Sequence, residues 1–246
     1  MNKTIEKFLT ENKDTLDRLA DFMLDYNTHT NLTRITDLDE IIEKHYIDSI
    51  LPLTLHNVPR GTIVQGCESM WNFPRGTTCL DVGSGAGFPG IPMKLLCPEL
   101  QMTLLDSAKK RTDYLKSLLE HIGVDCEVVT ARSEELAHNP DYRERYGLVT
   151  ARAVANLASL CEYCLPFVKP PVGSEQGGVF LAMKGSDAET AGTGKALEML
   201  GGEIQNVIEY DLPSGDKRNL IVIKKVRQTP TNYPRKRVNI TKNPIA

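Results

Sequence analysis

The first 55 residues carry the spacing of amphipathic helices. Apolar side chains recur at intervals of three and four across residues 16–24, which predicts a helix with one buried face. Polar, turn-prone residues at 26–33 interrupt this pattern. A second helix is predicted to begin at a cap formed by Asp37 and to run to Leu51, just before a proline. The pattern therefore predicts an N-terminal helical extension over residues 1–55.

Residues 56–77 are rich in proline and glycine and are interpreted as a linker. After them, short apolar strands alternate with helical patterns, which is typical of a mostly parallel sheet with helices on both faces. This α/β domain is predicted to span residues 78–225. In the C-terminal tail that follows, 226–246, Pro230 and Pro234 discourage further helix or strand. The strands are predicted at 79–82, 102–106, 126–130, 148–151, 179–183, 204–210 and 220–225.

A glycine-rich turn, Gly83-Ser84-Gly85-Ala86-Gly87, follows the first strand, and a helix is predicted to begin near Phe88. Glycine lets the backbone turn sharply and approach a ligand closely. The N-terminus of the helix then offers free N–H groups to an anionic or polar group. The run 85–90 also fits the dinucleotide fingerprint G-x-G-x-x-G, so an NAD-linked oxidoreductase is one alternative.

Two acidic residues change this picture. Asp81 ends the first strand, and its carboxylate would repel a pyrophosphate but attract a ligand that carries an ammonium and a sulfonium. Asp106 ends the second strand about 20 residues later, the usual distance to an acid that binds ribose. Together with Gly85 and Gly87, they indicate S-adenosylmethionine, with Asp106 on the ribose hydroxyls. Asp81 and the missing substrate-domain motifs argue against the NAD-linked alternative.

The end of the fourth strand narrows the chemistry of a methyl acceptor. Enzymes that methylate exocyclic amines typically place Asn/Asp-Pro-Pro-aromatic there, but this chain has Thr150-Ala151-Arg152-Ala153. The Pro-Cys nucleophile typical of pyrimidine C5 methylation does not occur either. A ring nitrogen with an in-plane lone pair, such as guanine N7, needs neither of these motifs. Proximity and orientation would then provide most of the rate enhancement. An arginine bidentate to O6 and N7 would block the reacting atom, so that geometry is not expected.

The charge distribution indicates which kind of partner the chain could bind. The net charge of −3 excludes a chain that is basic overall, yet residues 217–246 carry nine Lys and Arg and no Asp or Glu. Such a basic end can contact phosphates, although a solubilising tail has the same composition.

The chain is expected to be cytoplasmic. It has no apolar run of about 18 residues, which predicts no membrane span, and its charged N-terminus is not that of a signal peptide. Its six cysteines are predicted to be reduced thiols that pack as small hydrophobes. Cys161 and Cys164 have C-x-x-C spacing, but no second Cys/His pair accompanies them, so no metal site is expected. Residues 131–136 are predicted to form a loop.

With these motifs in view, the chain resembles the glucose-inhibited division protein B family, the bacterial small-subunit ribosomal RNA (guanine-N7)-methyltransferases. The resemblance runs from about Asn27 to the C-terminus, and the chain departs from the family in two longer segments, the linker 56–77 and residues 170–177. The motifs that carry it are Asn31-Leu32-Thr33, His45-Tyr46-Ile47-Asp48-Ser49, the run from Asp81 to Pro92, Leu105-Asp106-Ser107 with Lys110 and Arg111, Arg132-Ser133-Glu134-Glu135, Arg152-Ala153, Lys184-Gly185, Arg218-Asn219-Leu220 and the basic ending from Tyr233.

The resemblance implies a class I S-adenosylmethionine-dependent methyltransferase with a Rossmann-like, seven-stranded, mostly parallel sheet. It implies methylation of guanine N7 at one position in the decoding region of 16S rRNA, with free RNA or a small-subunit particle as partner and a monomer as the expected state. It assigns cofactor contacts to Gly83, Phe88, Ser133, Glu134 and Arg152. A catalytically weak RNA-binding ribosome assembly factor that retains the cofactor pocket stays as the alternative.

For the substrate side, the resemblance implies that Asn31, His45 and Asp48 face the site, although His45 in an apolar stripe is also compatible with a structural role. Arg132, Lys184 and Arg218 are implied to bind phosphate or guanine O6. The basic tail is predicted to contact RNA phosphates near the mouth of the site. Deleting residues 234–246 would then weaken RNA binding and leave S-adenosylmethionine affinity intact.

Overall fold

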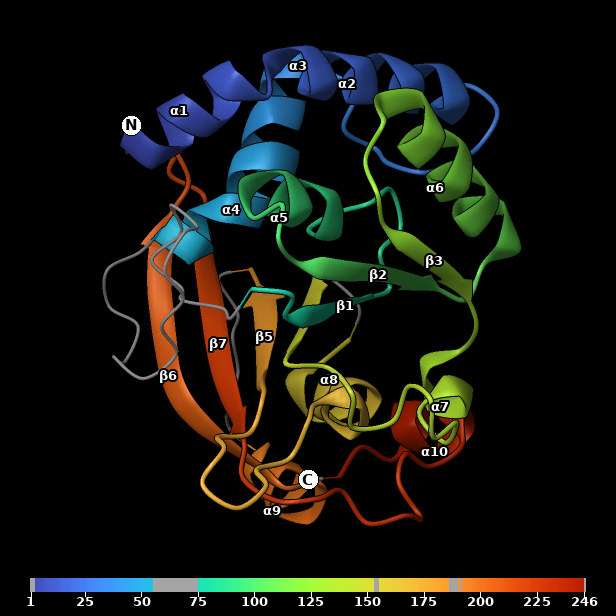
Figure 1. The fold of residues 1–246 in the computed structure, drawn as a ribbon, viewed down its shortest axis with the longest axis vertical. Coiled ribbons are helices and arrows are strands. Elements are labelled where there is room, and N and C mark those ends of the chain that lie inside the picture. Colours follow the sequence, from blue (N-terminus) through green and yellow to red (C-terminus); the bar gives the residue numbers. More distant parts are fainter. Residues whose placement is uncertain (1–2, 55–74, 153–154, 186–189, 191, 246) are drawn as a thin grey trace.

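The fold is built on a twisted seven-stranded sheet, seen edge to edge across Figure 1. This computed structural model describes residues 3–54, 75–152, 155–185, 190 and 192–245, so most of the predicted linker lies outside the described residues. The strand order is β3-β2-β1-β4-β5-β7-β6. The strands are β1 (Thr78–Val82), β2 (Gln101–Asp106), β3 (Glu127–Thr130), β4 (Leu148–Arg152), β5 (Val179–Lys184), β6 (Gly202–Asp211) and β7 (Lys217–Lys225).

The first five strands are parallel, whereas β7 runs antiparallel to both β5 and β6. This confirms the predicted mostly parallel sheet, and each predicted strand is present within a few residues of its expected bounds. The central strands β1, β4 and β5 are buried almost throughout because both of their faces are covered. The edge strand β6 alternates between exposed and more buried side chains instead.

Helices cover both faces of the sheet (Figure 1). One layer consists of the N-terminal helices with α5 and α6, and the other consists of α8, α9 and α10, each over its own hydrophobic cluster. The helices are α1 (Lys3–Glu11), α2 (Lys13–Asn27), α3 (Leu38–Ile41), the π-helical turn η1 (Ile42–Ile47), α4 (Asp48–Ile50), the 3₁₀ turn η2 (Leu51–Thr54), α5 (Gly90–Leu96), α6 (Lys109–Ile122), α7 (Ser133–Leu136), α8 (Leu157–Cys164), the 3₁₀ turn η3 (Leu165–Phe167), α9 (Gly194–Leu200) and α10 (Arg237–Lys242).

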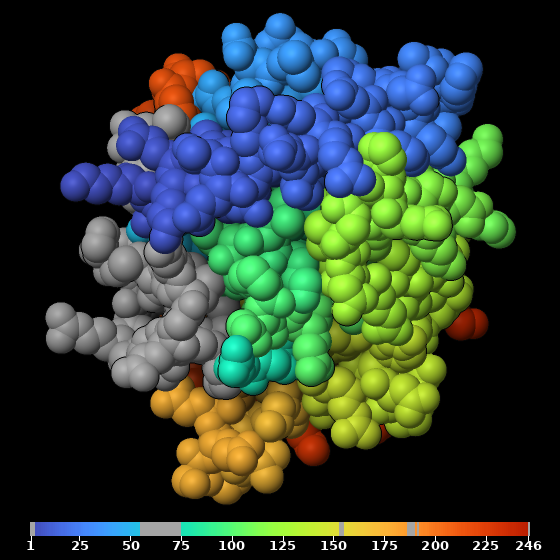
Figure 2. Space-filling view, turned by 45° about the horizontal axis from the view of Figure 1, so that its top comes forward, coloured from blue at the N-terminus to red at the C-terminus, as the bar shows by residue number. Residues whose placement is uncertain are grey.

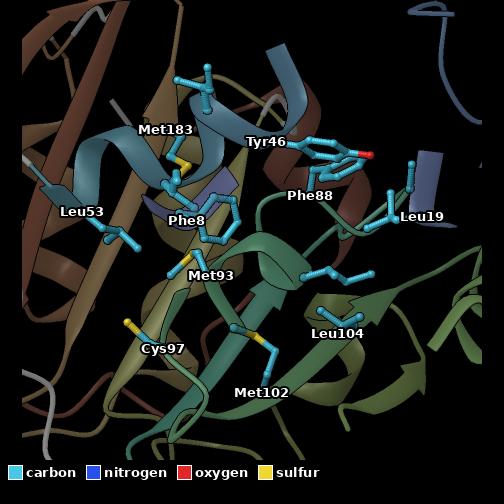
Figure 3. Packing of buried hydrophobic residues seen from close by; sticks show 14 of the residues in the cluster. Phe8, Leu19, Tyr46, Leu53, Phe88, Met93, Cys97, Met102, Leu104 and Met183 are labelled. Carbon is cyan, nitrogen blue, oxygen red and sulfur yellow. The ribbon is translucent and has the colours of Figure 1, made fainter. Parts of the chain in front are cut away.

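The N-terminal extension packs as part of the main body. Phe8 of α1 and Leu19 of α2 belong to the same core as Met93 of α5 and Leu104 of β2, as Figure 3 shows. In Figure 2 the blue α1 and α2 form a continuous band beside the yellow-green α6. The buried Tyr46 hydroxyl also donates a hydrogen bond of 2.8 Å to the carbonyl of α2 at Leu16, which fixes the second helical segment against the first.

The second helical segment begins as predicted and then changes from α-helical to π-helical hydrogen bonding. The Asp37 carboxylate accepts the Glu40 N–H at 3.1 Å and caps α3. The chain continues through the π turn η1, which holds His45, into α4. Single π turns in proteins are often found at functional sites. The sequence predicted one helix here, because hydrophobic spacing does not distinguish a local change from α to π hydrogen bonding.

Two predicted irregular segments are helical. Residues 131–136, predicted as a loop, contain the single turn α7, which is too short to show a periodic pattern. The tail forms α10 although Pro230 and Pro234 precede it. A proline disfavours a helix that continues through it, but the new helix begins three positions after Pro234. The prediction that the tail has no further helix is therefore wrong.

The tail is fastened to the second layer by a buried ion pair. The Glu162 side chain on α8 is fully buried, and it accepts the backbone N–H of Arg235 at 2.7 Å. The Arg235 guanidinium donates to both oxygens of the same carboxylate, at 2.9 Å from Nε and 2.7 Å from Nη2. Ile240 and Ile245 then bury their side chains in the core of this layer.

Four cysteines, Cys79, Cys126, Cys161 and Cys164, are free. Burial raises the pKa of the Cys161 and Cys164 thiols, in keeping with the predicted packing role of the C-x-x-C pair. Cys97 is disulfide-bonded, which departs from the predicted reduced state. In the part of the chain that the structure describes, no cluster of side chains suits a metal ion, and no helix is long and apolar enough to cross a membrane.

Replacing Arg235 with methionine should lower the free energy of unfolding by about 3 kcal/mol, because it leaves the Glu162 carboxylate buried without its cation. Urea denaturation measures this. The control Lys236→Met removes a neighbouring exposed charge and should change stability little. A cost below about 1 kcal/mol for Arg235→Met would contradict the role of the pair.

Candidate functional site

The glycine-rich turn after β1 is held by backbone geometry that side chains would disrupt. Gly85 has a φ of +57°, and its N–H donates to Asp106 Oδ2 at 3.1 Å. A Cβ atom on Gly90 would lie 2.4 Å from Leu104 Cδ2 and 2.9 Å from Asp81 Oδ2. The turn therefore packs directly on β1 and β2, and α5 begins at Gly90, two residues later than predicted.

Asp81 lies completely buried beneath this turn. Its Oδ2 accepts the Gly90 N–H at 3.1 Å, whereas its Oδ1 has no hydrogen-bond partner among the described residues. Burial raises the pKa of Asp81 to about 7, although the Gly90 N–H opposes that shift. An unpartnered buried carboxylate oxygen fits a ligand that brings positive charge to the turn, as S-adenosylmethionine would.

Asp106 connects the ends of β2 and the glycine turn. Its Oδ1 accepts the Ala108 N–H at 2.8 Å, and its Oδ2 accepts the Gly85 N–H and lies 3.4 Å from Arg111 Nη1. Two carboxylate oxygens offer about four acceptor positions, so the Asp106 carboxylate can still accept hydrogen bonds from ribose hydroxyls.

A first pocket of about 350 Å³ opens at the carboxyl ends of β1, β2, β3 and β4. This is where the strand order reverses direction, the usual position of a ligand site in an open α/β sheet. The residues predicted for cofactor contact that line it are Gly83, Asp106, Ser133, Glu134 and Arg152. Arg132, predicted for the substrate side, lines this first pocket as well. The Ser133 hydroxyl donates to the Tyr163 carbonyl at 2.6 Å, which joins α7 to α8 in one wall.

A second pocket of about 370 Å³ adjoins the first on the side of β4 and β5. It brings together His45, Asp48, Lys184 and Arg218, four residues predicted for the substrate side that lie far apart in sequence. Arg152, at the end of β4, lines both pockets. The Lys184 ammonium is held at the rim by a 2.6 Å hydrogen bond to the Ala155 carbonyl.

Asp48 is the centre of the polar contacts in the second pocket. Its Oδ2 lies 3.1 Å from Arg152 Nη1, and its Oδ1 lies 3.4 Å from Arg218 Nε. The Tyr210 hydroxyl donates to the same Oδ1 at 3.3 Å. Arg152 Nη1 also donates to the Lys44 carbonyl at 3.0 Å, which belongs to the π turn η1. One buried carboxylate thus fixes the orientation of two guanidinium groups.

His45 lines the second pocket as a neutral ring. It stacks on Phe88 with ring centroids 4.4 Å apart, and Arg152 Nη2 lies 3.4 Å from its Nδ1. Because an arginine only donates, Nδ1 accepts, and the Nε2 proton points to Thr33 Oγ1 at 3.1 Å. Burial and the Arg152 charge lower the pKa of His45 to about 4. His45 therefore has no free nitrogen with which to act as a base.

Several predicted residues lie outside both pockets. Asn31 is exposed and lines neither one. It is Asn27 that organises the loop, because its side-chain oxygen accepts the N–H groups of Leu32 at 2.9 Å and Thr33 at 3.2 Å. Phe88, Gly85, Gly87 and the fully buried Asp81 line neither pocket either.

The structure also adds residues that sequence reasoning missed. Tyr210 and the Lys44 carbonyl join the second pocket, and Tyr163 and Thr241 join the first, where they lie beside Arg237 of the basic tail. None of them carries a local motif. Tyr210 alone gives a weak signal, as a tyrosine at an inward-facing position of a β-strand, where the buried hydroxyl needs a partner.

The strand order with antiparallel β7, the glycine turn after β1 and the acid at the end of β2 define a class I S-adenosylmethionine-dependent methyltransferase. Comparison with known proteins gives the family. The model of the GidB family, described as rRNA small subunit methyltransferase G, matches residues 12–221, and the chain belongs to this family. The family predicted from the motifs is thereby confirmed, and the NAD-linked alternative is wrong.

Individual relatives match along nearly their whole length. The chain is 48% identical over 228 residues to the ribosomal RNA small subunit methyltransferase G of Acetivibrio thermocellus, covering 92% of this chain and 85% of that protein. The protein of the same name from Lactobacillus acidophilus is 44% identical, with 91% and 87% covered. That from Clostridium novyi is 42% identical, with 92% and 86% covered.

The lowered pKa of His45 predicts a pH dependence of stability. Between pH 7.5 and pH 5 the unfolded chain gains a proton on His45, whose ordinary pKa is 6.5, whereas the folded chain, with a pKa of about 4, keeps it neutral. The free energy of unfolding should therefore fall by about 2 kcal/mol from this group as the pH drops.

Urea denaturation at several pH values measures this contribution. His45→Gln should show a shallower fall than the wild type, and His29→Gln, which removes an exposed histidine, serves as the control. Equal slopes for His45→Gln and the wild type would mean that His45 is accessible to protons in the folded protein.

Proposed function

We propose that this protein methylates N7 of a guanine in 16S rRNA, with S-adenosylmethionine as the methyl donor. The single observation that carries the proposal is the pair of adjoining pockets that share Arg152. The first pocket suits the donor, because it combines the glycine turn, the ribose-binding acid Asp106 and the polar wall at Ser133 and Glu134. The second suits a planar base that carries acceptor atoms, because cations surround it.

The arrangement suits an acceptor that needs no base. When bound, S-adenosylmethionine supplies an electrophilic methyl group on a sulfonium, and guanine N7 takes a methyl group through its in-plane lone pair without losing a proton. Among the described residues that line the second pocket, none is an accessible proton acceptor: His45 is neutral with both nitrogens bonded, and Asp48 is bound to two arginines. The chain therefore contributes position and electrostatics rather than proton transfer.

Lys184 and Arg218 are the groups proposed to hold the guanine. Both line the second pocket from neighbouring strands, β5 and β7, and both present donors to an acceptor such as guanine O6 or a flanking phosphate. Asp48 acts as a positioning residue, since it holds Arg218 and Arg152 apart at fixed distances. The His45 ring, stacked on Phe88, keeps this wall rigid.

The direct test is transfer of a labelled methyl group from S-adenosylmethionine to 16S rRNA, followed by mapping of the modified base. Label on a guanine that becomes sensitive to cleavage at N7-methylguanosine supports the proposal. Label on another base or another guanine atom overturns it. Tight RNA binding with no label in free RNA, in partially assembled particles or in complete small subunits would favour the assembly-factor alternative.

Replacing Arg218 with alanine should lower kcat/KM for RNA about 10- to 100-fold, because it removes a charge-assisted hydrogen-bond donor from the second pocket. S-adenosylmethionine affinity should stay within about twofold of the wild type on the same reasoning, since Arg218 does not line the first pocket. Steady-state methylation and calorimetry measure the two effects.

The matched control is Lys217→Ala, which removes an exposed cation next to Arg218 on the same strand and outside both pockets. Equal losses of kcat/KM in the two variants would mean that Arg218 contributes only general positive charge and no specific contact. An unchanged kcat/KM for Arg218→Ala would remove it from the base-binding site.

A further inference from the structure

The C-terminal segment, residues 233–245, reaches the first pocket. Arg237 and Thr241, on α10, line this pocket together with residues from the ends of β1, β2 and β4. Figure 1 shows α10 beside α7 and α8. The segments η1 and α4, which line the second pocket, lie in the other helical layer. A segment that composition assigns to RNA contact is thus placed at the proposed donor site.

Specific contacts keep the segment there. The Arg235–Glu162 pair fixes the chain on α8, at the residue before the pocket-lining Tyr163. The Pro234 carbonyl lies 2.9 Å from His138 Nε2, just after α7. The Ser159 hydroxyl donates to the Ile240 carbonyl at 3.1 Å, which ties α10 itself to α8. Both helices that form the wall of the pocket therefore hold the segment.

The strand order shows which part of a ligand this wall would meet. The pocket extends from Arg152 on β4, past the glycine turn of β1 and Asp106 on β2, to Ser133 beyond β3. Asp81 at the end of β1 would attract the ammonium and sulfonium of the ligand, and Asp106 at the end of β2 would bind its ribose. The base of the ligand would then lie one strand further along, on the side of β3 and away from β4. Ser133 is joined to Tyr163 by a hydrogen bond, and α10 packs on the same helix, so Arg237 belongs to the base side.

The Arg237 guanidinium is available to a ligand. Its side chain is exposed and makes no hydrogen bond or ion pair with the residues that the structure describes. Arg235, two residues earlier, is committed to Glu162. A planar guanidinium can stack on a purine face and can donate hydrogen bonds to purine nitrogens, which an ammonium does less well.

We propose that Arg237 is a cofactor-binding residue that contacts the adenosine part of S-adenosylmethionine, and that the C-terminal segment is a wall of the donor pocket. This inference rests on the proposed function for the identity of the donor. It changes the role expected of the tail, because damage to the segment then weakens donor binding first, whereas an RNA-contacting tail would leave donor affinity intact.

The test uses Arg237→Ala in the full-length protein, with Lys236→Ala as a matched control. Lys236 is the adjacent cation, exposed and outside the pocket. Calorimetry measures the affinity of each variant for S-adenosylhomocysteine and for 5′-methylthioadenosine, which keeps the adenosine but lacks the amino-acid part. Filter binding to 16S rRNA at a fixed salt concentration gives the RNA affinity. Thermal denaturation checks that each variant is folded.

Arg237→Ala is expected to weaken both adenosine ligands by a similar factor of about 5- to 20-fold, the range of one charge-assisted or cation–π contact. Lys236→Ala should leave both affinities at the wild-type value. Unchanged ligand affinity in Arg237→Ala, with weaker RNA binding or without it, would overturn the inference. So would a loss confined to S-adenosylhomocysteine, because Arg237 would then contact the amino-acid part.

These measurements do not depend on methyl transfer, so the two proposals fail separately. A wild-type protein that binds neither adenosine ligand would overturn the donor assignment in the proposed function, and with it this inference. A wild-type protein that binds both ligands, alongside an Arg237→Ala variant of equal affinity, would overturn only the role of Arg237.

Discussion

The ion pair between Asp48 and Arg152 joins the N-terminal helices to the sheet at the point where the two pockets meet. Asp48 comes from α4 and Arg152 from the end of β4, and both side chains are largely buried. Burial lowers the pKa of the Arg152 guanidinium, and the neighbouring Asp48 carboxylate opposes this shift. Each charge would be costly in this place without the other. The helical extension is therefore held where the second pocket needs it.

This constraint also couples the two pockets. Arg152 lines the first pocket, and through Asp48 it is linked to Arg218 in the second pocket. A ligand that draws the Arg152 guanidinium towards the first pocket would alter the Asp48 contacts that orient Arg218. The π turn η1 supports this geometry, because its Lys44 carbonyl accepts a second hydrogen bond from Arg152.

The sequence predicted the sheet well because the signals of its strands are local. Each predicted strand is present, and the combination of Asp81, the glycine turn and Asp106 lies within one βαβ unit. For the second pocket, the family resemblance supplied Asp48, Lys184 and Arg218 by name. It did not give the partners of Asp48, because Arg152 and Tyr210 lie more than a hundred residues away in the sequence.

Arg132 and the tail lie elsewhere than the sequence alone suggests, each because of a long-range feature of the fold. Arg132 follows β3, and the strand order puts the end of β3 beyond β2, at the first pocket rather than the second one. The tail is basic in composition, yet its Arg235 is bound to a buried glutamate of α8 that nothing in the local sequence reveals. Composition counts charges, whereas the fold decides which charges are already neutralised. The positive charge available to RNA is therefore smaller than the nine cations of the C-terminal region suggest.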